Sequence, residues 1–117
     1  MKPAPIKPST TVEDLSKLDI RVGEIVEVEE VPESRKLVKL TVDFGDHRRT
    51  ILAGIKQERE DPGEIRGRQA LFVVNLAPRR MAGVISEGML LDIGYADGID
   101  PALAMPEFPV PNGARAG

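Results

Sequence analysis

Alternation of apolar and polar positions dominates the chain between residues 20 and 93 and predicts β-strands. In residues 38–44 every second residue is apolar, with Lys39, Thr41 and Asp43 between them, as in a half-buried strand. The same period of two recurs in residues 20–28 and 48–53. Residues 70–74 are continuously apolar, as in a strand covered on both faces, and residues 89–93 give a fifth strand.

Two interruptions of this pattern indicate how the strands are arranged. The apolar phase of residues 20–28 shifts after Gly23, which predicts a bulge that curls the first strand. Residues 57–61 break the β pattern and are expected to form a helical turn that Pro62–Gly63 ends. Five strands with a short helical connection between the third and the fourth predict an all-β, five-stranded OB-fold barrel. The pattern alone leaves an SH3-like barrel or a small sandwich as alternatives.

The two ends of the chain differ from its strand-rich middle. Residues 1–10 contain three prolines and two lysines and are expected to be a flexible tail, which leaves residues 11–117 as one domain. Thr10 and Glu13 have the spacing of a capping box and predict a short N-terminal helix, which needs a surface to pack on. The glycines and prolines beyond Ile93 predict an irregular C-terminal extension.

Composition limits the chemistry that we expect from the chain. It has 117 residues, no cysteine and one histidine, His47, which excludes disulfides, thiol catalysis and the common Cys or two-His metal sites. Ser34 and Ser86 have no convincing base partner, and Gly63 and Gly67 lack the lysine of a phosphate-binding loop. We therefore expect no enzymatic activity, no metal and no cofactor. No apolar stretch has the length of a signal peptide or a membrane span, so we expect a cytoplasmic protein without membrane insertion.

The charge distribution changes the first impression of an acidic protein. The net charge is −3, yet residues 31–56 carry +3 and residues 65–82 carry +4. Only four residues are aromatic, and Phe44 and Phe72 stand at core-like positions, so few rings are free to stack on bases. This combination excludes a protein that coats single strands and leaves a reader of folded RNA.

Several short blocks of sequence stand out together. They are Leu18–Val26, Pro32–Leu37, Val42–Gly45, Ala53–Ile55, Gly67–Gln69, Asn75–Val84 and Ser86–Leu91. In this order they resemble the tRNA-binding domain family, OB-fold modules found as small dimeric tRNA-binding proteins or fused to methionyl- and phenylalanyl-tRNA synthetases. Ser34 and Arg35 depart from the family pattern, which usually has Ala and Asp there.

This resemblance implies a homodimer that binds tRNA largely by shape and backbone contacts, without catalysis. Carried over to this chain, the residues expected to contact RNA are Lys36, Asn75, Arg79, Arg80, Ser86 and Met89. An arginine pairs with phosphate, Asn and Ser hydrogen-bond to backbone or base, and Met offers an adaptable apolar contact.

A related branch gives an alternative function. The CsaA-type secretion chaperones are similar in their opening strand, in Pro78–Arg80 and in an ending like Pro109–Gly113. That branch tends to have Ser-Glu-Val where this chain has Ser86–Met89. The resemblance therefore also allows a chaperone that binds unfolded or pre-secretory polypeptides through an apolar groove. The sequence does not separate the two branches, nor does it give a tRNA preference or an association with a synthetase.

Overall fold

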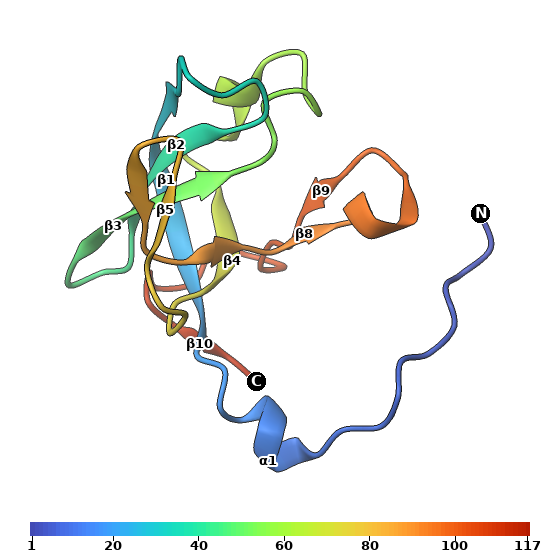
Figure 1. Cartoon of the computed structure of the whole chain (residues 1–117). Helices are drawn as coiled ribbons and strands as arrows, with labels where there is room; N and C mark the ends of the chain where they lie inside the picture. Colours follow the sequence, from blue (N-terminus) through green and yellow to red (C-terminus); the bar gives the residue numbers. More distant parts are fainter.

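A curved antiparallel sheet forms the body of the protein in the computed structural model, which describes residues 1–117 (Figure 1). Its strands are β1 (Ile20–Glu30), β2 (Val38–Asp43), β3 (Arg48–Ala53), β4 (Gln69–Val73) and β7 (Met89–Leu90). They lie in the order β3-β2-β1-β4-β7, and β10 (Arg115–Ala116) also pairs with β1.

The sheet bends until its two edges meet, and side chains join them. The amide of Glu87 donates to the Thr50 carbonyl at 2.8 Å, and the amide of Thr50 donates to Glu87 Oε1 at 3.1 Å. Two residues along, the amide of Leu52 donates to Ser86 Oγ at 3.0 Å. Arg49 Nη1 bonds the carbonyls of Val74 and Glu87. The barrel is thus nearly closed, and the predicted five-stranded OB-fold is confirmed.

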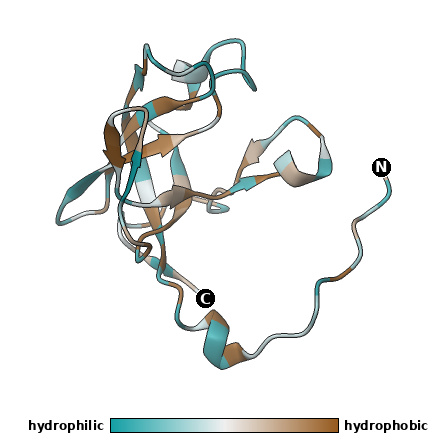
Figure 2. Cartoon of the chain, viewed as in Figure 1, coloured by the Kyte–Doolittle hydropathy of each residue, from teal (hydrophilic) through white to brown (hydrophobic).

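The core lies inside this barrel. Ile25, Leu40, Ile51 and Phe72 are completely buried, one from each of the four long strands. Phe44 meets Phe72 edge to face with ring centroids 5.6 Å apart. Figure 2 shows hydrophobic residues concentrated on the strands, whereas the turn between β2 and β3 is hydrophilic.

The predicted bulge in β1 is present, but it lies beyond Gly23. The register of β1 against β2 shifts between Ile25 and Glu27. Gly23 instead allows close packing, because a Cβ there would lie 2.4 Å from Cγ1 of Val42 and 2.8 Å from Cε1 of Phe44. Gly23 is therefore required by close packing, and the shift of the apolar phase comes from the bulge between Ile25 and Glu27.

Two short helical predictions were wrong in detail. The N-terminal helix α1 (Val12–Leu15) is present, but Thr11 and not Thr10 caps it, accepting from the amide of Asp14. The connection between β3 and β4 is the 3-10 helix η1 (Pro62–Ile65), so Pro62 begins the helical turn. Proline suits the first helical position because that amide has no partner within the helix. None of the helices is long and apolar enough to cross a membrane.

Two hairpins were not predicted. The first joins β5 (Arg79–Met81) to β6 (Val84–Ser86). The second joins β8 (Asp92–Ile93) to β9 (Ala102–Leu103) around the 3-10 helix η2 (Tyr95–Asp97), and it projects from the barrel in Figure 1. The predicted strand at residues 89–93 is therefore divided at Leu91, with its first part in the barrel and its second part in this hairpin.

The C-terminal extension is fastened to the barrel. The Gln69 side chain bonds both backbone groups of Val110 and, at 2.8 Å, Oδ1 of Asn112. Asn112 also donates to Glu24 at 3.2 Å. Gly113 then passes so close to the chain at residue 44 that an added Cβ would lie 2.2 Å from the Phe44 carbonyl oxygen. The segment predicted to be irregular is thus held by specific bonds.

One buried carboxylate oxygen in the fold has no hydrogen-bond partner. Oε2 of Glu58 is buried and accepts no hydrogen bond. Burial raises the pKa of Glu58 above its usual value, the nearby charge of Asp92 raises that pKa further, and Arg59 opposes the shift. The ionised form of Glu58 therefore destabilises the folded state.

Replacing Ala82 with Asn should stabilise the protein. Ala82 and Gly83 form the turn of the β5–β6 hairpin with φ of +48° and +80°, as in a type I′ turn, where Asn-Gly is preferred. We expect Ala82→Asn to add roughly 0.5–1 kcal/mol to the free energy of unfolding, measured by urea denaturation. Ala96→Asn, on exposed η2, is the control, and an equal effect of both would contradict strain at residue 82.

Replacing Glu58 with Gln should raise Tm at neutral pH. The neutral Glu58 carboxyl contributes fully to stability below the pKa that Glu58 has in the unfolded chain. This contribution is lost as pH rises through the higher pKa that Glu58 has in the folded protein. The gain from Glu58→Gln should therefore vanish below about pH 4. Thermal melts across this range, with exposed Glu60→Gln as control, test the sign, and a lower Tm at neutral pH would contradict it.

Candidate nucleic-acid interface

A hollow of about 250 Å³ opens on the barrel surface where its edges meet, and we call it the closure hollow. Its walls come from the end of β3, the start of the β5–β6 hairpin and the segment Ser86–Asp92. Most lining side chains are apolar, among them Leu52, Ile55 and Leu90. Arg79 and Asp92 are the charged residues of the lining, so the hollow combines an apolar floor with one positive and one negative group.

Arg79 and Arg80 come from β5 and are both exposed. Arg79 lines the closure hollow and makes no hydrogen bond or ion pair within the chain. Successive residues of a strand face opposite sides, so Arg80 faces away, and its guanidinium is 3.5 Å from the Gly83 carbonyl. Arg79 is therefore the cation that is free to bind an anion at the mouth of the hollow.

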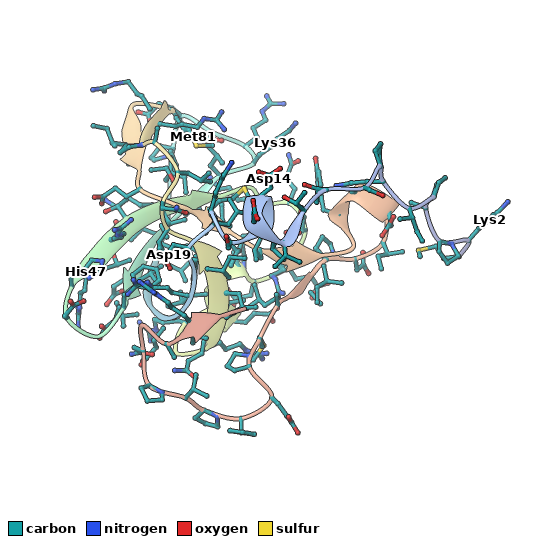
Figure 3. All side chains as sticks on the ribbon, turned by 90° about the horizontal axis from the view of Figure 1, so that it is seen from below. Lys2, Asp14, Asp19, Lys36, His47 and Met81 are labelled. Atoms are coloured by element: carbon teal, nitrogen blue, oxygen red, sulfur yellow. The ribbon has the colours of Figure 1, made fainter.

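Lys36 lies on the turn between β1 and β2, and its carbonyl accepts from the amide of Lys56, next to the lining residue Ile55. Ser34 Oγ accepts from the amides of Lys36 and Leu37, which shapes this turn. Lys56 fastens it to the end of β3, because its Nζ donates to the carbonyls of Val31 and Ser34 and its amide donates to the Lys36 carbonyl. Figure 3 places Lys36 and Met81 on one side of the molecule. The sequence did not reveal this bracing role of Lys56.

Met89 and Ser86 line the closure hollow in different ways. Met89 is 47% exposed and offers its thioether to a ligand. Ser86 is only 4% exposed, and besides accepting from Leu52 its hydroxyl lies 3.2 Å from the Gly88 carbonyl. The Ser86 hydroxyl is thus occupied in holding the wall of the hollow.

Asn75 does not join this group. Its Oδ1 accepts from the amide of Asp19 and its Nδ2 donates to the Lys17 carbonyl, both at 2.7 Å. Asn75 therefore fastens the segment after α1 to the end of β4. Asp19 also accepts from Arg21 at 2.9 and 3.1 Å, and this bond holds the pKa of the Asp19 carboxyl below its usual value.

A second, larger apolar surface surrounds α1, and we call it the α1 face. Val12, Leu15 and Leu18 expose 83%, 58% and 44% of their surface there. Leu71 and Leu91 from the barrel line the same open hollow, with Arg115 from β10 at its edge. A four-residue helix with no buried residue has little to hold it in place alone, so this face lacks a covering partner.

The remaining basic residues and the histidine lie elsewhere. Arg68 and Gly67 bond the backbone of Ile25 in the middle of β1, far along the chain from the hollow. His47 is at the end of β2 opposite to Lys36 (Figure 3), bonded to Asp46 at 2.6 Å and to Arg49 at 3.0 Å. Of the basic residues in these segments, only Arg79 lines the closure hollow.

Known proteins share this architecture. Residues 20–115 match the family described as "Putative tRNA binding domain". The chain is 47% identical over 107 residues to a methionine–tRNA ligase of Nitrosospira multiformis and 41% identical over 112 residues to that of Nitrosomonas europaea. These matches cover 92% and 96% of the chain but only 14% and 16% of the two ligases.

Solved structures agree with the sequence comparisons. A MetRS-related protein from Pyrococcus horikoshii superposes with a TM-score of 0.86 at 37% identity, covering 95% of this chain and all of that one. The chaperone CsaA from Bacillus anthracis superposes with a TM-score of 0.82 at 32% identity, covering 94% of this chain and all of the chaperone. The barrel, its motifs and the match over residues 20–115 together show that the chain belongs to the tRNA-binding domain family.

Proposed function

We propose that this chain binds folded tRNA at the closure hollow and acts by binding, without catalysis. The observation that carries the proposal is an unpaired Arg79 guanidinium at the mouth of an apolar hollow. Lys36 lies on a turn bonded to Lys56, next to the lining residue Ile55. The cations contact phosphates and so position the RNA, while Met89 contacts a base or a sugar inside the hollow. Ser86 supports this site by holding its wall, whereas Asn75 fastens the segment after α1 to the end of β4.

The charge of the protein shapes how it binds. Arg79 is the one cation in the lining of the hollow, and the net charge of −3 repels the rest of a polyanion. A small number of phosphate contacts gives modest affinity with a shallow dependence on salt. Binding of this kind selects a folded RNA whose backbone follows the rim, so shape and backbone contacts dominate over sequence.

We also propose that two copies associate through the α1 face. This face exposes large apolar side chains of α1 next to Leu71 and Leu91 of the barrel, and such a surface is costly to leave in water. The arrangement places a four-residue helix where a second copy covers it. A dimer presents two closure hollows to one RNA, which strengthens weak single contacts.

A second candidate is a chaperone that takes apolar side chains of an unfolded polypeptide into the closure hollow. The likeness to CsaA and the two methionines that line the hollow, Met81 and Met89, favour it. The ending Pro109–Gly113, which suggested that branch in the sequence, is bonded to Gln69 and Glu24 and so is part of the scaffold. A pull-down scored for tRNA against polypeptide separates the two functions.

Arg79→Ala should weaken tRNA binding by roughly 10- to 150-fold, the value of one charge-assisted bond. The slope of log affinity against log salt should also fall by about one, whichever tRNA is used. Filter binding at low and physiological salt measures both. Arg66→Ala is the matched control, an exposed arginine outside the hollow, and it should change affinity less than about twofold. Equal losses in both variants would contradict binding at the hollow.

Leu15→Asp should convert a dimer into a monomer, because it places a charge in the centre of the α1 face. Sedimentation at micromolar concentration measures the mass of wild type and variant. Ile6→Asp is the control, since Ile6 is 99% exposed in the N-terminal segment and should leave the dimer intact. A monomeric wild type, or a dimer that survives Leu15→Asp, would rule out this interface.

A further inference from the structure

Asp92 gives the closure hollow a feature that phosphate binding does not use. It lines the hollow as its acidic residue, and its carboxylate makes no hydrogen bond or ion pair within the chain. The backbone around it is fixed, because Leu91 bonds Leu71 and Ala104 and Asp92 itself pairs with Leu103 across the β8–β9 hairpin. A rigidly placed, unpaired carboxylate in a hollow for a polyanion calls for a hydrogen-bond donor on the ligand.

Glu58 strengthens this argument. Its amide bonds the carbonyl of Ile55, a lining residue, so Glu58 lies one turn beyond the wall of the hollow. Its carboxylate is close enough to Asp92 for the two charges to repel, and its Oε2 is buried without a donor. The hollow therefore has an excess of acceptors around Asp92, and it also contains the unpaired guanidinium of Arg79.

We propose that the closure hollow holds one unstacked guanine base of the bound RNA. This inference rests on the proposed function. The guanine N1–H and N2–H₂ groups lie side by side and donate to the two carboxylate oxygens of Asp92, while Arg79 binds an adjacent phosphate. Met89 and Leu90 cover the face of the ring, and a thioether packs well against an aromatic ring.

The size of the hollow and the base edges both support this choice. Pockets for drug-sized ligands measure about 300–1,000 Å³, so a hollow of about 250 Å³ suits a fragment such as one base. Uracil offers a single ring donor between two carbonyl acceptors, and cytosine places a ring acceptor beside its amino group. Adenine likewise pairs one amino group with an acceptor. Guanine alone offers two adjacent donors to a carboxylate.

Titration of the full chain with each nucleoside 5′-monophosphate tests the inference directly. In ¹⁵N NMR spectra of wild type, GMP should shift the amides of Gly54, Met89 and Leu90. Its affinity should exceed that of UMP, CMP and AMP by about tenfold, as one bidentate base contact provides. Asp92→Asn should reduce that ratio to about one, because the amide replaces one acceptor with a donor. Arg79→Ala should weaken all four nucleotides alike.

Asp97→Asn is the matched control, since Asp97 is exposed on η2 and does not line the hollow. It should keep the preference for GMP. Equal affinities for the four nucleotides in wild type, or a preference that survives Asp92→Asn, would overturn the inference. Binding of whole tRNA is measured separately by filter binding. If wild type binds tRNA but shows no preference for GMP, the guanine site is refuted and the proposed tRNA binding is not. Shifts at these amides with Nα-acetyl-lysine amide but not with GMP would overturn it in favour of a polypeptide ligand.

Discussion

The junction between β3 and residues 86–88 is the constraint on which the rest of the structure depends. No regular strand pairing joins these edges, and the bonds of Leu52 to Ser86 and of Thr50 to Glu87 close the barrel instead. Arg49 adds a charge-assisted link, because its Nη1 donates to the carbonyls of Val74 and Glu87. Because side chains and not a full ladder close it, the surface remains hollow there, and the closure hollow is the direct result.

Electrostatics and burial act together at this hollow. The acidic protein places the unpaired guanidinium of Arg79 at the closure hollow, where apolar walls strengthen a charged contact. Lys56 and Ser34 use their polar groups to shape the turn that carries Lys36, so that turn is positioned before a ligand arrives. Preordered contacts of this kind offset part of the entropy lost on binding, which matters most where contacts are few.

Much of the fold was predictable from the sequence. The alternation over residues 38–53 is typical of strands buried on one face, and the apolar run at 70–74 is typical of a strand buried on both faces. The β5–β6 hairpin was not predictable, since Ala82 stands at a turn position where Asn or Gly is usual. Nor was the division at Leu91, which depends on long-range bonds to residues 71 and 104. For the site, Arg79 and Met89 line the closure hollow, and their contact with RNA stays a prediction. The bonds that occupy Asn75 and Ser86 come from tertiary packing, which the sequence did not reveal.

The block Ser86–Met89, which reads as one motif in the sequence, has two structural roles. Its first residues close the barrel and its last residue is exposed. Ser86 and Glu87 close the barrel, and Gly88 permits the closure, because a Cβ there would lie 3.0 Å from the Val73 carbonyl oxygen and 3.1 Å from Ile51 Cδ1. Only Met89 reaches outward. A branched residue in place of Gly88 must displace one of these neighbours. Because Gly88 lines the closure hollow, such a change would also alter the shape of the hollow.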